Sequence, residues 1–221
     1  MASYSAQGLV LKKTRLGEAD LIITMLSTEG KQLRAVAKGA RKSGSTTAAR
    51  LELGHVVDVL LHQGKNLDIV IEVRLVESNP GCSLDIEHMT ACAVVLELAE
   101  KSTRDFNLEP LVYKMSTEAI RCIGLSSDAA PALIAAAAVL KVCAALGFGP
   151  VFDTDAVLPA GDRQWVEQLL RLRFCEIQLL DDARYQTVAL HMLACAKEWL
   201  SVHLDIRLRS VEILQGLLGP Q

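Results

Sequence analysis

The residues with the clearest chemical potential lie between positions 31 and 50, in the segment KQLRAVAKGARKSGSTTAAR. This window holds six Lys or Arg and no Asp or Glu, although the whole chain has a net charge of −3. Alternation over residues 31–38 predicts a strand with one buried face, and a basic loop rich in small residues follows at 39–47. Such a strand and loop can follow a phosphate backbone. A solvated strand face with a disordered loop explains the charge equally well.

Other parts of the chain offer weaker candidates for chemistry. The sequence contains no Gly-x-x-x-x-Gly-Lys-Ser/Thr loop and no Gly-x-Ser-x-Gly elbow. His191 lies on an apolar helical face, so we expect a hydrogen-bonded core residue. Asp181 and Asp182 suit a helix cap better than a cation site, and nothing close in sequence activates Cys175. We therefore expect a protein that is not an enzyme.

Cysteine usage and hydropathy bear on the compartment. The six cysteines are widely spaced and form no Cys-x-x-Cys pair, which is typical of buried free thiols in a reducing cytoplasm. The apolar segment at 133–146 is shorter than the ~20 residues that cross a bilayer, and Lys141 interrupts it, so a buried central helix is favoured. We expect a cytoplasmic protein without membrane contact, metal or cofactor. If the basic segment at 31–50 binds DNA, the protein is also associated with the nucleoid.

The periodicity changes once along the chain. The first part alternates with period two and predicts five strands, at residues 8–16, 19–27, 31–38, 55–62 and 67–76. Five strands in about 70 residues, with one longer link, fit a small closed barrel, of which the OB-fold is the best known. After Asn79-Pro80-Gly81 the pattern is helical, with helices predicted at 83–102, 107–123, 127–146, 164–174, 183–203 and 207–218.

The two halves also differ in charge. Residues 1–80 carry 11 basic and 8 acidic side chains, whereas residues 81–221 carry 12 and 18. This asymmetry suggests two modules with different partners. We therefore predict an α+β chain, with a five-stranded OB-fold nucleic-acid-binding domain at residues 1–80 and an all-α domain for protein interactions at residues 81–221.

Short motifs point to a family. They are Gly-Leu-Val-Leu-Lys at 8–12, Gly-Glu-Ala-Asp-Leu at 17–21, Gly-Lys-Gln-Leu at 30–33 and, as the most specific, Ala-Val-Ala-Lys-Gly-Ala-Arg-Lys-Ser at 35–43. Leu-Gly-Phe-Gly-Pro at 146–150 and Leu-Arg-Ser at 208–210 add weaker matches. Together they resemble the bacterial recombination mediator RecO, most strongly over residues 8–45.

The resemblance implies an N-terminal OB-fold, a helical C-terminal domain and no bond chemistry. Members of that family bind single- and double-stranded DNA, anneal complementary strands, contact RecR and the C-terminal tail of the single-strand-binding protein SSB, and help load RecA onto SSB-coated DNA. Carried over by position, the implied DNA contacts are Lys12, Arg15, Lys31, Arg34, Lys38, Arg41 and Lys42.

Two departures from the family pattern refine these expectations. Many members carry paired zinc-binding cysteines after the Leu-Gly-Tyr turn, but residues 151–157 contain none, so we predict no zinc site. The helix before that turn reads Ala-Ala-Ala-Ala-Val-Leu at 135–140 in place of Arg and Glu, which removes charges from part of the expected site for the SSB tail.

The binding mode follows from the scarcity of aromatic residues, which make up 4% of the chain. Base stacking should contribute little, so we expect weak sequence preference and similar affinity for single and double strands. About five phosphate contacts to a single strand predict a slope near −3.5 against log salt. An RNA-binding OB module and a protein-interaction adaptor are the alternatives.

Overall fold

The structure, a computed structural model, describes residues 2–104, 108–126, 130–147, 160–180 and 184–219. The chain divides into two compact units. The barrel unit comprises residues 1–79 and 99–117, and the helical unit comprises residues 80–98 and 118–221. The strands thus share a compact unit with a helical segment from later in the sequence.

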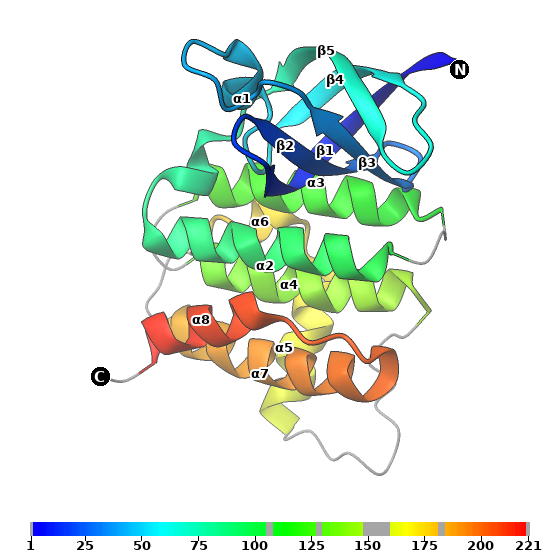
Figure 1. Cartoon of the computed structure of the whole chain (residues 1–221). Helices are drawn as coiled ribbons and strands as arrows, with labels where there is room; N and C mark the ends of the chain where they lie inside the picture. Colours follow the sequence, from blue (N-terminus) through cyan, green and yellow to red (C-terminus); the bar gives the residue numbers. More distant parts are fainter. Residues whose placement is uncertain (1, 105–107, 127–129, 148–159, 181–183, 220–221) are drawn as a thin grey trace. The chain divides into compact units, whose positions relative to one another are not determined.

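The barrel unit contains five strands, β1 (Ser3–Leu16), β2 (Asp20–Ser27), β3 (Gln32–Ala37), β4 (Val56–His62) and β5 (Asp68–Glu77). They form a closed barrel in the order β1-β2-β3-β5-β4 (Figure 1). All pairs are antiparallel except β3 with β5. This small five-stranded barrel followed by helices confirms the predicted OB-fold plus helical class.

The barrel core follows the alternation seen in the sequence. Inward side chains such as Val10, Ile23, Met25 and Leu61 are completely buried. Unbroken alternation along β5 would place Ile71 on the same side as the buried Val73, but Ile71 is exposed. Ile71 has no partner where the β4–β5 register shifts, so it is the extra residue of a β-bulge.

The basic loop predicted at residues 39–47 is a loop only as far as residue 45. A short helix, α1 (Thr46–Arg50), follows residues 39–45. Arg50 Nη1 donates to the Val73 carbonyl of β5 at 2.9 Å. Ala40 and Leu51, on either side of α1, are buried in the barrel core, so this segment closes part of the barrel.

Gly30, in the turn between β2 and β3, allows residues that precede α3 to lie close to this turn. Its φ is +80°, which favours glycine. A Cβ at this position would overlap the backbone of Glu109. Glu109 directly precedes α3 (Pro110–Gly124), so the missing side chain lets this segment approach the turn. The predicted start of this helix, at residue 107, lies outside the described residues.

The helical unit contains η1 (Pro80–Ser83) and most of α2 (Ile86–Ser102), whose last turn belongs to the barrel unit. Later helices are α4 (Ala130–Ala145), α5 (Ala160–Arg171), α6 (Phe174–Ile177), α7 (Arg184–Leu204) and α8 (Arg209–Leu218).

The central helix of this unit is α4. It is buried at almost every position and packs against α5, α6 and α7 (Figure 1), which confirms the predicted buried helix. Within the described ranges, no helix is long and apolar enough to cross a membrane.

Two helix faces depart in part from a simple helical period. On α2 this period places Ile86 and Met89 on one stripe with Leu96 and Ala99. Leu96 and Ala99 are buried, but 54% and 46% of the surfaces of Ile86 and Met89 are exposed. His191 of α7 is exposed rather than part of the core. The buried side of α7, which packs against α4 in the same unit, carries Met192, Leu193, Ala196 and Leu200.

The cysteines are all free, and three of them, Cys92, Cys122 and Cys143, are buried as expected. Helix α5 begins within the segment predicted as a loop. The cap expected at Asp181-Asp182 lies outside the described residues, as do residues 151–157.

Candidate nucleic-acid interface

The outer side of β1, β2 and β3 carries a row of polar side chains. Lys12 of β1 lies opposite Thr24 of β2, and Thr24 lies opposite Arg34 of β3. Directly opposite residues in antiparallel strands point to the same side. With strands about 4.8 Å apart, the Cα atoms of Lys12 and Arg34 are separated by roughly 10 Å. The two cations therefore flank a hydroxyl on one surface.

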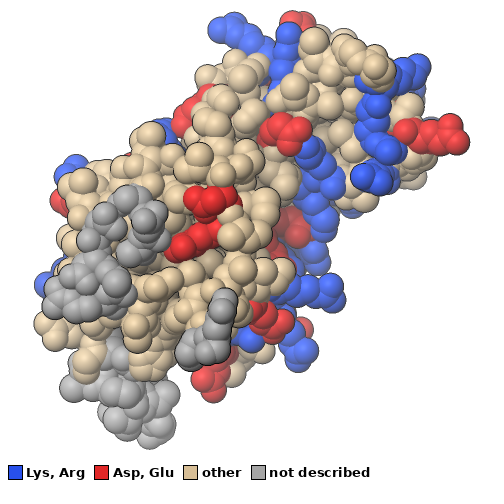
Figure 2. All heavy atoms as spheres, turned by 90° about the vertical axis from the view of Figure 1, so that its left-hand side faces the viewer, with Lys and Arg blue, Asp and Glu red and all other residues tan. Residues whose placement is uncertain are grey.

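A hollow of about 430 Å³ lies over this row. Four cations and one carboxylate line it, together with neutral polar groups. The lining residues are Lys12, Thr14, Thr24, Lys31, Gln32, Arg34, Glu100, Thr103 and Arg104. On the face drawn in Figure 2, Lys and Arg side chains gather over the barrel, with carboxylates between them.

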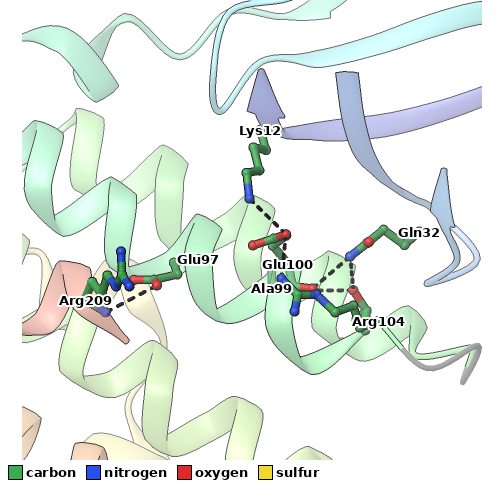
Figure 3. Close-up of polar contacts among 8 residues, drawn as sticks. Lys12, Gln32, Glu97, Ala99, Glu100, Arg104 and Arg209 are labelled. Atoms are coloured by element: carbon green, nitrogen blue, oxygen red, sulfur yellow. Dashed lines mark hydrogen bonds and ion pairs between the residues drawn. The ribbon is translucent and has the colours of Figure 1, made fainter. Parts of the chain in front are cut away.

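The last turn of α2 forms one wall of this hollow. Gln32 Nε2 donates to the backbone carbonyl of Glu100 at 2.8 Å and to Thr103 Oγ1 at 3.3 Å (Figure 3). The hydroxyl of Thr103 donates to the Ala99 carbonyl at 2.6 Å. These bonds fix the helical turn against β3, and Glu100 and Arg104 thereby reach the cationic row.

Arg15 and Lys13 lie on the other side of the same sheet. Lys13 pairs with Ile23 and Arg15 with Leu21, whose side chains point inward. Lys13 forms an ion pair with Glu52. Arg15 therefore does not share the face of Lys12 and Arg34, so the seven implied DNA-contact residues are not on one surface.

Arg41 has a structural role at the turn between β1 and β2. Its Nη1 donates to the carbonyls of Gly17 and Glu18, at 3.1 and 2.9 Å, and so holds this turn. The remaining predicted contacts are exposed and form no ion pair or side-chain hydrogen bond within the described part of the chain. They are Arg15, Lys31, Arg34, Lys38 and Lys42.

Comparison with known proteins places this arrangement in a family. Residues 1–79 match the family described as recombination protein O N terminal, and residues 83–163 match recombination protein O C terminal. The chain belongs to the RecO family. The first match covers the strands, and the second begins just before α2.

Curated relatives named DNA repair protein RecO agree with this membership. The chain is 36% identical to the protein of Frankia casuarinae over 155 residues, which cover 69% of this chain and 63% of the relative. It is 34% identical to the Cutibacterium acnes protein, covering 68% and 63%. The Bifidobacterium longum protein is 31% identical over 186 residues, covering 83% and 77%. The chain thus spans just under two thirds of the Frankia and Cutibacterium relatives.

The barrel of this RecO-family chain has one aromatic residue among residues 1–80, Tyr4. Its ring packs against the barrel core, and its hydroxyl donates to the Asp68 carboxylate. Burial, reinforced by this acceptor, raises the pKa of Tyr4 to about 12. Tyr4 is thus engaged in core packing and is a poor platform for stacked bases.

Sequence reasoning missed the residues that α2 brings to the site of this RecO-family chain. Glu100 and Arg104 are four residues apart, a spacing that favours an ion pair on a helix. Their side chains do form this pair, at 3.0 Å. Nothing in the sequence shows that the pair lies beside Lys12, because that contact joins residues 88 positions apart.

Proposed function

We propose that this RecO-family chain acts in recombinational DNA repair by binding DNA on the outer side of β1, β2 and β3. The observation that carries this proposal is the row of Lys12, Thr24 and Arg34 beneath a hollow that Lys31 and Arg104 also line. The relatives' name, DNA repair protein RecO, supports it.

The chemistry of this surface suits the sugar–phosphate chain. Lysine and arginine neutralise phosphates and release counterions, which gives affinity without sequence preference. The side chain of Tyr4 is engaged in the core, so stacking adds little. We therefore propose similar binding of single and double strands. Four cations in contact with a single strand predict a slope of about −3 against log salt.

Annealing and partner binding are further parts of this proposal. Two strands can approach each other after their charges are neutralised on the barrel, because their mutual repulsion is then reduced. Residues 81–221 carry 18 acidic and 12 basic side chains, so this half is less suited to DNA. We assign RecR and the tail of SSB to it, with assistance to RecA loading as the outcome. The protein performs no bond chemistry in this proposal.

Reversing the charge of Arg34 tests the DNA surface. Arg34 is exposed and has no ion pair in the described ranges, so Arg34→Glu should leave the barrel folded. We expect affinity for a labelled single strand and for the matched duplex to fall about tenfold or more at low salt, with a shallower salt slope. Fluorescence anisotropy measures both quantities.

The matched control is Lys65→Glu, which makes the same charge change in the turn between β4 and β5, where Lys65 is exposed. We expect its affinity to stay within about twofold of the unaltered protein. Unchanged DNA affinity in Arg34→Glu would contradict the proposal and favour a protein-interaction adaptor. Competition with matched RNA separates the RNA-binding alternative.

A further inference from the structure

One carboxylate lies inside the cationic hollow. Glu100 Oε1 accepts from Lys12 Nζ at 3.3 Å and from Arg104 Nη2 at 3.0 Å (Figure 3). Only 13% of the Glu100 side chain is exposed, against 51% for Lys12 and 56% for Arg104. A single oxygen thus bridges two cations at a largely covered position.

Glu100 is also held in place through its backbone. Its carbonyl accepts from Gln32 Nε2 at 2.8 Å, and Gln32 belongs to the strand that carries Arg34. The carboxylate is therefore a built part of the hollow. A phosphate oxygen prefers the same charge-assisted donors, lysine ammonium and arginine guanidinium.

We propose that Glu100 occupies the position of a backbone phosphate in the unbound protein, so that DNA must replace this carboxylate at Lys12 and Arg104. This inference rests on the proposed function, because it assigns DNA to the same surface. The ligand that displaces Glu100 is a phosphodiester of a nucleic acid. Glu100 lowers the affinity of the barrel for DNA, since its charge repels the incoming phosphate and occupies two donors.

A purely structural role for Glu100 makes the opposite prediction. If the carboxylate served only to orient Lys12 and Arg104 toward DNA, its removal would release both side chains and weaken binding. If Glu100 competes with phosphate, its removal strengthens binding. The sign of the change therefore separates the two roles.

The test is Glu100→Gln, which keeps the shape of the side chain and removes its charge. We expect DNA to bind about threefold to tenfold more tightly at low salt. We also expect the salt slope for a single strand to stay at about −3 in both proteins, because the same four cations reach phosphates once Glu100 is displaced. Circular dichroism and thermal unfolding verify that the variant is folded.

The matched control is Glu52→Gln. Glu52 pairs with Lys13 on the other side of the sheet, and the substitution makes the same change in net charge. We expect an affinity within about twofold of the unaltered protein. An equal gain in both variants would show a general charge effect and would overturn the inference, as would unchanged or weaker binding by Glu100→Gln.

A double-mutant cycle with Lys12→Ala adds a readout of the competition itself. If Glu100 withholds Lys12 from phosphate, Glu100→Gln should strengthen binding less when Lys12 is absent. Additive effects of the two substitutions would contradict the inference. The result for Arg34→Glu separates the two proposals. If Arg34→Glu does not weaken DNA binding, the proposed DNA surface itself is wrong. Loss of binding by Arg34→Glu without a gain by Glu100→Gln refutes only the role of Glu100.

Discussion

The barrel unit contains both paired and unpaired cations: Lys12 and Arg104 pair with Glu100, but several other exposed cations of this unit have no ion pair among the described residues. They include Lys31, Arg34 and Lys38. In the helical unit, Arg173 pairs with Glu176 at 3.1 Å and Lys197 pairs with Glu212 at 2.8 Å. This difference supports the proposed DNA surface on the barrel, because cations without a carboxylate partner are available to phosphate.

Lys141 of α4 shows the same contrast in the interior of the helical unit. Its ammonium donates to the Leu170 carbonyl at 2.7 Å and lies 5.6 Å from the centre of the Phe174 ring. Burial lowers the pKa of Lys141. This lysine contributes to packing between helices, whereas Lys31, Lys38 and Lys42 of the barrel unit are exposed and have no ion pair among the described residues.

The largest effect on the stability of the barrel unit should come from Gly30→Ala. The substitution places a Cβ against the Glu109 backbone at a φ of +80°, so we expect a loss of about 3 kcal/mol in the free energy of unfolding. Displacement of residues 99–117, which carry Glu100 and Arg104, should also change DNA affinity. Thermal unfolding and fluorescence anisotropy measure the two changes.

Gly17→Ala is the control that measures the cost of a positive φ without a steric overlap. Gly17 has a φ of +56°, but a Cβ there would meet nothing within 4 Å. We expect a loss of about 1 kcal/mol without a change in DNA affinity. Equal losses in the two variants would contradict the close approach of Glu109 to the turn.

A smaller effect is expected at the start of α2, in the helical unit. Asp85 Oδ1 accepts the backbone N–H of His88 at 2.9 Å and so caps the helix. Asp85→Ala should cost about 1 kcal/mol in the free energy of unfolding. DNA affinity should remain unchanged, because the cap lies outside the barrel unit. A clear loss of DNA affinity in Asp85→Ala would contradict the proposal that DNA binding depends on the barrel unit alone.

The cap also predicts a dependence on pH. The backbone N–H and side chain of His88 lower the pKa of Asp85. A carboxylate with a lowered pKa in the folded state stabilises the protein at neutral pH and loses this contribution as the pH falls below about 4. Asp85→Asn keeps a capping oxygen, so it should retain most of the stability at neutral pH while losing this contribution to the pH dependence.

Strand positions could be predicted from the sequence because alternating apolar residues identify each strand of the barrel. The register could not be predicted, because one extra residue moves every later side chain to the other side. The irregularity between Val10 and Lys12 places Lys12 outward and Arg15 inward. Sequence spacing alone gave no sign of this change.

The candidate site could be predicted only where one local segment supplies it. Arg34 follows directly from the alternation of β3, whereas Glu100 and Gln32 meet through a contact between distant parts of the chain. The buried character of α4 was evident from its continuous apolar sequence. The buried side of α7 was not, because its apolar residues lie on more than one face: Leu193 and Leu200 are completely buried, whereas Trp199 is only half-buried.

The most direct test of the central claim is the DNA affinity of Arg34→Glu measured beside Arg15→Glu. The two substitutions make the same charge reversal on opposite sides of one sheet. If DNA lies on the outer side, Arg34→Glu should weaken binding about tenfold or more, and Arg15→Glu less than about threefold. Equal losses, or a larger loss at Arg15, would contradict the account.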